Sequence, residues 1–328
     1  MLRARITVWV ISAALLAAQT GTVWSQSATK GQSQAFPTKP IRIVTSGAGG
    51  GTDFASRMIA QGLTENLNQQ IVVDNRASGV IPGDIVHKAA PDGYTLLLAT
   101  GILWLLPFLQ DKVPYDPVKD FAPVTLAVSS PNILTVTPSL PVKSVKELIA
   151  YAKARPGALN YAITSQGGGA HLAAELFMVT SSVNMVRIPY KSGGTAVTEL
   201  IAGQVHLYFV SAGSVVPHLK SGRLRGLAVT GAKPSAIFPE LPTVAATLPG
   251  YELETIYGVF APARTPDEII NKLQREIVRA INKPEIKDKL LNTSVEPIGS
   301  TPAALAALRK SEMVRMGKII KDAGIRAE

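Results

Sequence analysis

Two glycine-rich segments contain the residues best suited to hold a small anion. One reads Ser46-Gly47-Ala48-Gly49-Gly50-Gly51-Thr52-Asp53 and the other reads Ser165-Gln166-Gly167-Gly168-Gly169-Ala170-His171. In each case a β-rich run precedes the glycines and a helical pattern follows them. A helix N-terminus presents unpaired N–H groups and a partial positive charge, and glycine lets an anion approach that backbone closely. Two such turns facing one another would bind a carboxylate from both sides, although a single glycine turn is also typical of tight packing.

Neither segment matches a nucleotide-binding motif. The first one lacks the lysine that holds phosphates in a P-loop, and its spacing departs from the dinucleotide fingerprint. Asp74, at the end of the following strand, is an acidic residue that weakly favours a dinucleotide site. We therefore expect no cofactor.

Residues for hydrolysis or for a metal site are present but form no recognised pattern. Ser165 and His171 could join Asp53 or Asp92 in a triad on paper, yet the sequence contains no G-x-S-x-G elbow. A histidine at a helix start suits ligand contact or capping better. The four histidines, at positions 87, 171, 206 and 218, lack metal-ligand spacing. The sequence therefore favours a protein that is not an enzyme and holds no metal ion.

Residues 1–25 have the layout of a cleaved secretory signal. Arg3 and Arg5 precede an apolar run from Ile6 to Ala18, and Val23-Trp24-Ser25 has the spacing that a signal peptidase recognises, with cleavage after Ser25. A membrane anchor is the alternative, but the run is shorter than the ~20 residues that a span needs. The polar residues 26–36 are predicted to form a mobile leader.

The rest of the composition predicts a soluble protein of two domains. The chain has 328 residues, of which 46% are hydrophobic and 17% charged, so a large core is possible. The absence of cysteine excludes disulfides and thiolate metal sites. The net charge of +10 favours anionic solutes, but the basic residues are scattered singly and do not indicate nucleic-acid binding.

Strands alternate with helical patterns in two blocks, which predicts an α/β fold with a largely parallel sheet in each block. The first block contains the β-rich runs 41–45, 70–73 and 94–100, and the second begins near Val124. Ser144 and Glu147 stand at capping-box spacing before a helix that reaches Ala154. Trp104 follows a strand end, either as a core residue or as an apolar wall for a ligand.

The sequence resembles a known family at this point. The stretches PTKPIRIVTSGAGGGTDFASRMIAQGL, QQIVVDNRASG, KAAPDGYTLLLAT and LNYAITSQGGGAHLAAELF are similar to those of the extracytoplasmic solute receptors of tripartite tricarboxylate transporters, the TctC-like or Bug proteins. The likeness continues through IPYKSGGTAVTELIAGQVHLYF and YGVFAPARTPDEIINKL. It spans essentially the whole chain after residue 36 in the correct order.

The resemblance implies a two-domain periplasmic-binding-protein fold of the type II kind, with a ligand cleft between the domains and a hinge of crossover strands. Domain 1 would comprise residues 37–126 plus 231–328, and domain 2 residues 127–230. Such a receptor is a periplasmic monomer that captures a small carboxylate and delivers it to a membrane permease of two unlike subunits. A ligand sensor that signals to a membrane partner is the alternative.

The resemblance also implies which residues contact the ligand. In domain 1 these are Ser46 to Asp53, Asn75, Ser78, Thr100 and Gly101; in domain 2 they are Ser165 to Gly169, His171, Tyr190, Gly194, Thr195, Val210 and Ser211.

Three departures from the family pattern bear on the ligand. The first glycine turn is about one residue shorter than the common form, Val210 stands where an aspartate is common, and the segment around Trp104 is more apolar than usual. The loss of an acidic group and the gain of Trp104 favour an aromatic or aliphatic carboxylate over an amino acid.

Overall fold

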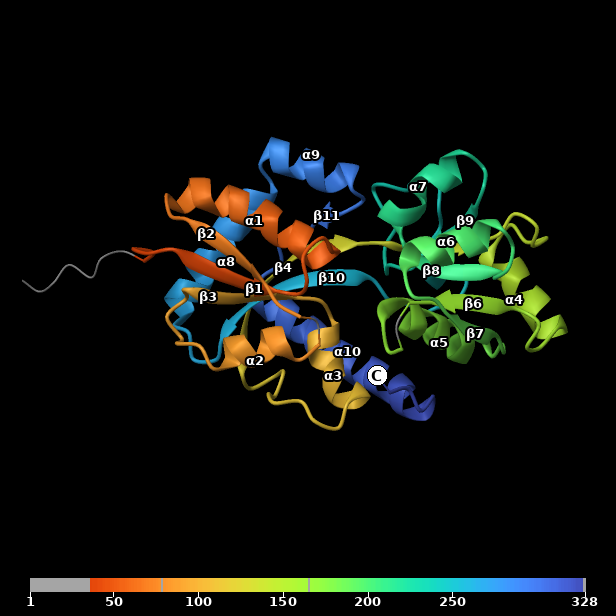
Figure 1. Ribbon diagram of the computed structural model, residues 1–328, viewed down its shortest axis with the longest axis horizontal. Coiled ribbons are helices and arrows are strands. Elements are labelled where there is room, and N and C mark those ends of the chain that lie inside the picture. Colours follow the sequence, from red (N-terminus) through yellow and green to blue (C-terminus); the bar gives the residue numbers. More distant parts are fainter. Residues whose placement is uncertain (1–35, 78, 165, 327–328) are drawn as a thin grey trace, which may run out of the picture. The chain divides into compact units, whose positions relative to one another are not determined.

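The computed structural model describes residues 36–77, 79–164 and 166–326. The predicted signal peptide, nearly all of the predicted leader, and the predicted contact residues Ser78 and Ser165 lie outside this range. Strands and helices alternate around two sheets, which confirms the predicted α/β class (Figure 1). Among the described helices, none is both long and apolar enough to cross a membrane.

The first sheet combines strands from the two ends of the described chain. Its order is β11-β4-β10-β3-β1-β2. The strands are β1 (Ile41–Thr45), β2 (Ile71–Asn75), β3 (Thr95–Ala99), β4 (Phe121–Ser130), β10 (Thr255–Pro262) and β11 (Glu296–Pro297). β1 pairs in parallel with β2 and β3, so the carboxyl ends of these three strands lie on the same side of the sheet.

The second sheet is formed by one continuous stretch of the chain. Its order is β7-β6-β8-β5-β9. The strands are β5 (Asn132–Val136), β6 (Asn160–Ile163), β7 (Val186–Pro189), β8 (Leu207–Ser211) and β9 (Arg225–Val229). β6 pairs in parallel with β7 and β8, which again brings the ends of successive strands to one edge.

Both sheets are more mixed than the alternation of strands and helices predicts. β10 runs antiparallel to β3 and β4, and β5 runs antiparallel to β8 and β9. Strands β4 and β5 are joined directly through Pro131, without a crossover helix, so the chain passes from one sheet to the other. A strand that returns from a distant part of the sequence, as β10 does, need not follow the direction of its neighbours.

The predicted boundary after residue 126 falls inside β4. This strand pairs with β10 as far as the Ser130–Thr255 pair, so the passage between the sheets lies at Pro131. The return passage lies between the end of β9 and the start of β10. The exact domain boundaries otherwise stay a prediction.

Helices follow most of the strands and cover the sheets (Figure 1). They are α1 (Gly51–Leu67), α2 (Ile81–His87), α3 (Ile102–Leu109), α4 (Val145–Ala154), α5 (Gly169–Ser181), α6 (Gly193–Ile201), α7 (Ala212–Lys220), α8 (Asp267–Ile281), α9 (Pro284–Asn292) and α10 (Pro302–Asp322). The predicted cap of α4 is present, because the Glu147 N–H donates to the Ser144 hydroxyl over 3.1 Å.

Candidate ligand pocket

The first glycine turn leaves the beginning of α1 open to a ligand. Gly50 is the N-cap of α1 and has no side chain to accept hydrogen bonds from the first N–H groups of the helix. These groups carry the positive end of the helix dipole. Gly47 to Gly50 are exposed, and a Cβ placed on Gly47 would meet nothing within 4 Å. An anion can therefore approach this backbone without steric hindrance.

Asp53 holds the shape of this turn from within. Its side chain accepts a hydrogen bond from the Gly49 N–H over 2.9 Å and another from the Asn75 amide over 3.0 Å. The guanidinium of Arg57 lies 2.9 Å away. The Gly49 N–H is the main reason why the pKa of Asp53 is lowered, and burial opposes it. Asp53 and Asn75 therefore support the turn, since their polar atoms already have partners in it.

The second glycine turn is built on the same plan with a different acceptor. The Gly167 N–H donates to Nδ1 of His171 over 3.0 Å, four residues further along, as Gly49 does to Asp53. Both donor glycines have a positive φ, +81° at Gly49 and +72° at Gly167, which favours glycine. Gly168 is the N-cap of α5 and, like Gly50, has no side chain to cap the helix.

His171 is a supporting residue of this turn and is 1% exposed. Its Nε2 lies 3.3 Å from a carboxylate oxygen of Glu175 and 3.2 Å from Nη1 of Arg187. The Tyr161 hydroxyl donates to the same carboxylate over 2.9 Å. Burial acts to raise the pKa of Glu175, but the hydrogen bonds from His171 and Tyr161 outweigh it and hold that pKa below its usual range. Because both ring nitrogens of His171 are engaged, this imidazole is not presented to a substrate as a base.

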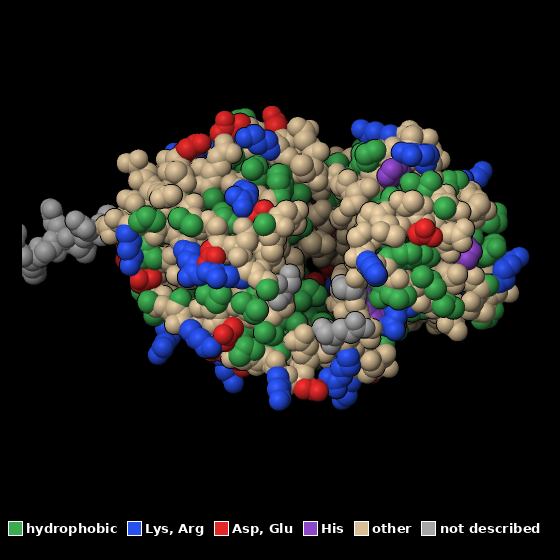
Figure 2. Space-filling model, viewed as in Figure 1, with side chains coloured by type: hydrophobic (Ala, Val, Ile, Leu, Met, Phe, Trp, Pro, Cys, Tyr) green, Lys and Arg blue, Asp and Glu red, His purple; other side chains and the backbone are tan. Residues whose placement is uncertain are grey.

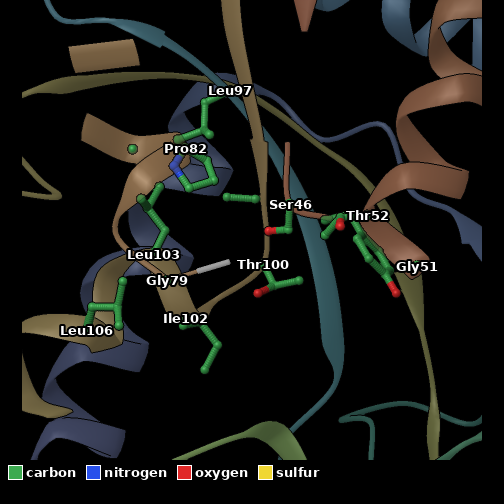
Figure 3. Close-up of a pocket in the computed structure, with 13 residues that line it drawn as sticks. Ser46, Gly51, Thr52, Gly79, Pro82, Leu97, Thr100, Ile102, Leu103 and Leu106 are labelled. Atoms are coloured by element: carbon green, nitrogen blue, oxygen red, sulfur yellow. The ribbon is translucent and has the colours of Figure 1, made fainter. Parts of the chain in front are cut away.

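A pocket of about 290 Å³ lies beside the first turn. Residues of α1, α2, β3, α3 and β10 line it, together with residues from the loops that follow β1, β2 and β3. The lining residues are Ser46, Gly51, Thr52, Gly79, Pro82, Gly83, Leu97, Ala99, Thr100, Ile102, Leu103, Leu106 and Tyr257. Figure 3 shows Ser46, Thr52 and Thr100 on one side of the pocket and Pro82, Leu103 and Leu106 on the other. The pocket therefore has a hydroxyl-bearing end next to α1 and an apolar end next to α3.

Tyr257 is a pocket residue that the sequence did not indicate. It lies on β10, and its hydroxyl is so close to Gly51 that a Cβ at that position would overlap with it. Burial raises the pKa of Tyr257 to about 12, so the hydroxyl stays a neutral donor at physiological pH. More than 200 residues separate it from Gly51 in the sequence, and no local pattern links the two positions.

Trp104 does not form a wall of the pocket. It is 0% exposed, its indole N–H donates to the carboxylate of Glu312 over 2.9 Å, and its ring packs edge-on against Phe260 at 6.0 Å. Of the two positions that the sequence allowed for Trp104, the structure therefore shows the one in the core. A helix presents residues three and four apart on one face, so the α3 residues Ile102, Leu103 and Leu106 line the pocket while Trp104 points into the core.

The remaining predicted contacts do not line this pocket: Gly101 is the N-cap of α3, and the others belong to the part of the chain that forms the second sheet. Tyr190 and Ser211 follow or end strands of that sheet, Gly194 and Thr195 are in the first turn of α6, and Val210 is buried within β8. The two regions approach each other closely at the second glycine turn. A Cβ on Gly167 would come within 2.9 Å of the side chain of Leu109, at the end of α3. On the face shown in Figure 2, the surface is hollowed between the parts that carry the two sheets.

No group of three or more metal-ligating side chains comes together within the described residues. Asp92, the other acid considered for a triad, accepts from the Tyr94 N–H and lies near Lys39. Neither a metal ion nor a triad is supported by these residues.

Comparison with known proteins places this geometry in a family. A model described as "Tripartite tricarboxylate transporter family receptor" matches residues 55–325. BugT of Bordetella pertussis is 34% identical over 295 residues, which cover 88% of this chain and 90% of BugT. This family consists of solute-binding receptors and is not an enzyme family.

Two solved structures are similar over nearly the same range. R. palustris Rpa4515 with adipate is 36% identical with a TM-score of 0.74, and covers 89% of this chain and 99% of its own. MatC from Rhodopseudomonas palustris with bound malate is 28% identical with a TM-score of 0.70, and covers 87% of this chain and 100% of its own. These likenesses confirm the predicted fold and the predicted resemblance. The chain belongs to the tripartite tricarboxylate transporter family receptors, the solute-binding proteins that include the Bug proteins.

Proposed function

We propose that this chain captures a small carboxylate with an aromatic or aliphatic body and delivers it to a membrane permease of two unlike subunits. The observation that carries the proposal is the pocket beside the first glycine turn. It joins the open N-terminus of α1 to an apolar wall supplied by α2, β3 and α3. A carboxylate with an apolar body matches both ends.

The polar end of the pocket suits a carboxylate for electrostatic reasons. The N–H groups at the start of α1 and the hydroxyl groups of Thr52, Thr100 and Tyr257 are donors on residues that line or adjoin the same pocket. Such donors favour a negative group. An amino acid would also bring an ammonium group, and the nearest buried acid, Asp53, already has three partners. The pocket therefore favours a carboxylate without an amino group.

The relatives support the same class of ligand and a role in transport. Adipate and malate, which are bound to two similar receptors, are carboxylates. The family description names a tripartite transporter, in which a receptor works with membrane subunits. The predicted signal peptide agrees with a place in the periplasm. We propose that the protein acts there as a monomer with no catalytic activity, and that ligand contacts from residues 165–169, 190–195 and 211 complete the site.

Native mass spectrometry of protein purified without refolding tests the proposal first, because a tightly held solute can be identified by its mass. Titration calorimetry with benzoate-like acids, dicarboxylates and amino acids then ranks the classes. We expect a stoichiometric carboxylate complex without turnover. Preferential binding of amino acids would contradict the proposed ligand class.

A pair of matched variants locates the site. Tyr257→Phe removes one donor from the pocket and keeps the ring, whereas Tyr151→Phe makes the same change on α4, outside the pocket. A hydrogen bond to a charged group contributes about 1.5–3 kcal/mol, so the first change should weaken carboxylate binding by roughly ten- to a hundredfold. The Tyr151→Phe change should leave the affinity for the carboxylate unchanged. Equal affinities in both variants would exclude Tyr257 from the site.

A further inference from the structure

The described residues at the apolar end of the pocket include no charged side chain that could pair with an anion. Among its described lining residues, none is Asp, Glu, His, Lys or Arg. Hydroxyls occur at the end next to α1, in Ser46, Thr52, Thr100 and Tyr257. The walls toward α2 and α3 are Pro82, Leu97, Leu103 and Leu106 (Figure 3). Within this pocket, a ligand therefore finds side-chain donors at one end only.

This apolar wall is held firmly in place. Leu97, Leu103 and Leu106 are at most 5% exposed, and they belong to the same buried cluster as Trp104. Trp104 in turn is fixed to α10 by its hydrogen bond to Glu312. Side chains packed in this way cannot turn aside to let water reach a charge placed among them. An ionised group at that end would lose hydration without gaining a charged side-chain partner among the described lining residues, which is unfavourable.

The charged group that does lie behind the pocket has the wrong sign for a second carboxylate. A Cβ on Gly101, at the start of α3, would be 3.2 Å from a carboxylate oxygen of Glu312. Glu312 is 7% exposed, and it is an acid. The charged side chain nearest to Gly101 is thus an acid, and no basic side chain is among the described lining residues.

We propose that the ligand is a monocarboxylate whose uncharged aliphatic or aromatic body fills the end of the pocket between α2 and α3. This inference rests on the proposed function and narrows it. It distinguishes this chain from the two similar receptors with adipate and malate, because both of those ligands carry two carboxylates. The volume of about 290 Å³ is at the lower end for ligand pockets, which suits a small acid.

Calorimetry with straight-chain acids tests the inference on the unmodified protein. Each methylene buried in an apolar pocket should improve affinity by about fourfold from acetate through butyrate to hexanoate, until the pocket is full. Hexanoate and adipate form a matched pair, since they have the same number of carbons and differ in one terminal carboxylate. Hexanoate should bind at least about tenfold more tightly than adipate, because the second carboxylate stays unpaired.

A charge introduced into the apolar end should reverse this preference. Ile102 lines the pocket and is half-buried, so Ile102→Arg places a cation there at small cost to the core. This variant should gain at least about tenfold for adipate relative to hexanoate. Val314→Arg is the control, because Val314 is 72% exposed on α10 and outside this pocket. It should keep the original preference.

The possible results separate the two proposals. Tight binding of monocarboxylates that increases with chain length supports both. Adipate binding as tightly as hexanoate to the unmodified protein overturns the monocarboxylate inference and leaves the carboxylate receptor in place. If no carboxylate binds and the copurified solute is of another class, both are wrong.

Discussion

Glu254 should make the stability of this protein depend on pH in the neutral range, and Glu254→Gln should abolish that dependence. Its carboxyl group lies where the chain passes between the two sheets. It is packed against Gly231, just after β9, so closely that a Cβ there would overlap with it. It also hydrogen-bonds the side chain of Ser129 near the end of β4.

The surroundings of Glu254 oppose its ionisation. Burial is the main cause, and the nearby carboxylates of Glu296, Glu252 and Glu312 add repulsion, while the hydrogen bond with Ser129 acts in the opposite direction. Together they raise the pKa of Glu254 from 4.5 to about 7. The protonated form is therefore the one that the fold favours.

The sign and size of the effect follow from this pKa. Below pH 4.5 Glu254 is protonated in both the folded and the unfolded chain, so its favourable contribution is fully present. As the pH rises toward about 7, the unfolded chain ionises more readily and the contribution is lost. At 1.36 kcal/mol per pH unit, the loss by pH 8 is about 3 kcal/mol. The glutamine of the Glu254→Gln variant is neutral at every pH, so the variant should gain about 3 kcal/mol relative to wild type between pH 4.5 and pH 8.

Urea unfolding curves at half-unit steps from pH 4.5 to 8.5 measure this difference directly. The exposed Glu240 provides the control, since Glu240→Gln should reproduce the wild-type pH profile. A constant free-energy difference between wild type and Glu254→Gln over the whole range would refute the reasoning, because an ordinary glutamate is already ionised throughout most of it.

Three further predictions concern the residues that support the pocket and the two glycine turns. Trp104→Phe should cost about 1–3 kcal/mol in urea unfolding by leaving the Glu312 carboxyl without its indole donor, and should cost clearly less in a Glu312→Gln background. His171→Ala removes the acceptor of the Gly167 N–H, so amide exchange at Gly167 should become faster while exchange at Gly49 stays the same. Gly49→Ala should destabilise the protein by about 1–2 kcal/mol because φ is +81°, whereas Gly47→Ala, at an ordinary φ with open space, should have little effect; equal costs would contradict the role of backbone strain.

The sequence indicated the parts of the site that are local in the chain. A strand, a glycine turn and a helix follow one another within about fifteen residues in each glycine segment, and the structure forms both helices directly after the glycines. The cap of α4 is also local, because Ser144 and Glu147 are three residues apart. Local patterns of this kind depend on backbone geometry and capping, which the residue types themselves reveal.

The features of the site that depend on residues far apart in the chain could not be predicted from the sequence. Tyr257 reaches Gly51 only because β10 inserts between β3 and β4, and nothing in the sequence near Gly51 specifies that neighbour. The sequence leaves two positions open for Trp104, the core and the pocket, because an apolar run does not indicate which face of its helix is buried. That choice is made by Glu312 on α10, which accepts the indole hydrogen bond from 208 positions away.

The two glycine turns share one hydrogen-bond arrangement but use different side chains as the acceptor. Each needs a glycine with positive φ whose N–H is held by the side chain four residues later, and this bond keeps the helix start in place. Asp53 can serve as that acceptor in the first turn because Arg57 and Asn75 offset its charge, so that it does not repel an anion bound at α1. In the second turn His171 accepts through Nδ1 only while that nitrogen is unprotonated, and Glu175 holds the remaining proton on the Nε2 side. A bound carboxylate therefore meets backbone N–H groups whose positions are set by Asp53 in one turn and by the Nδ1 atom of His171 in the other.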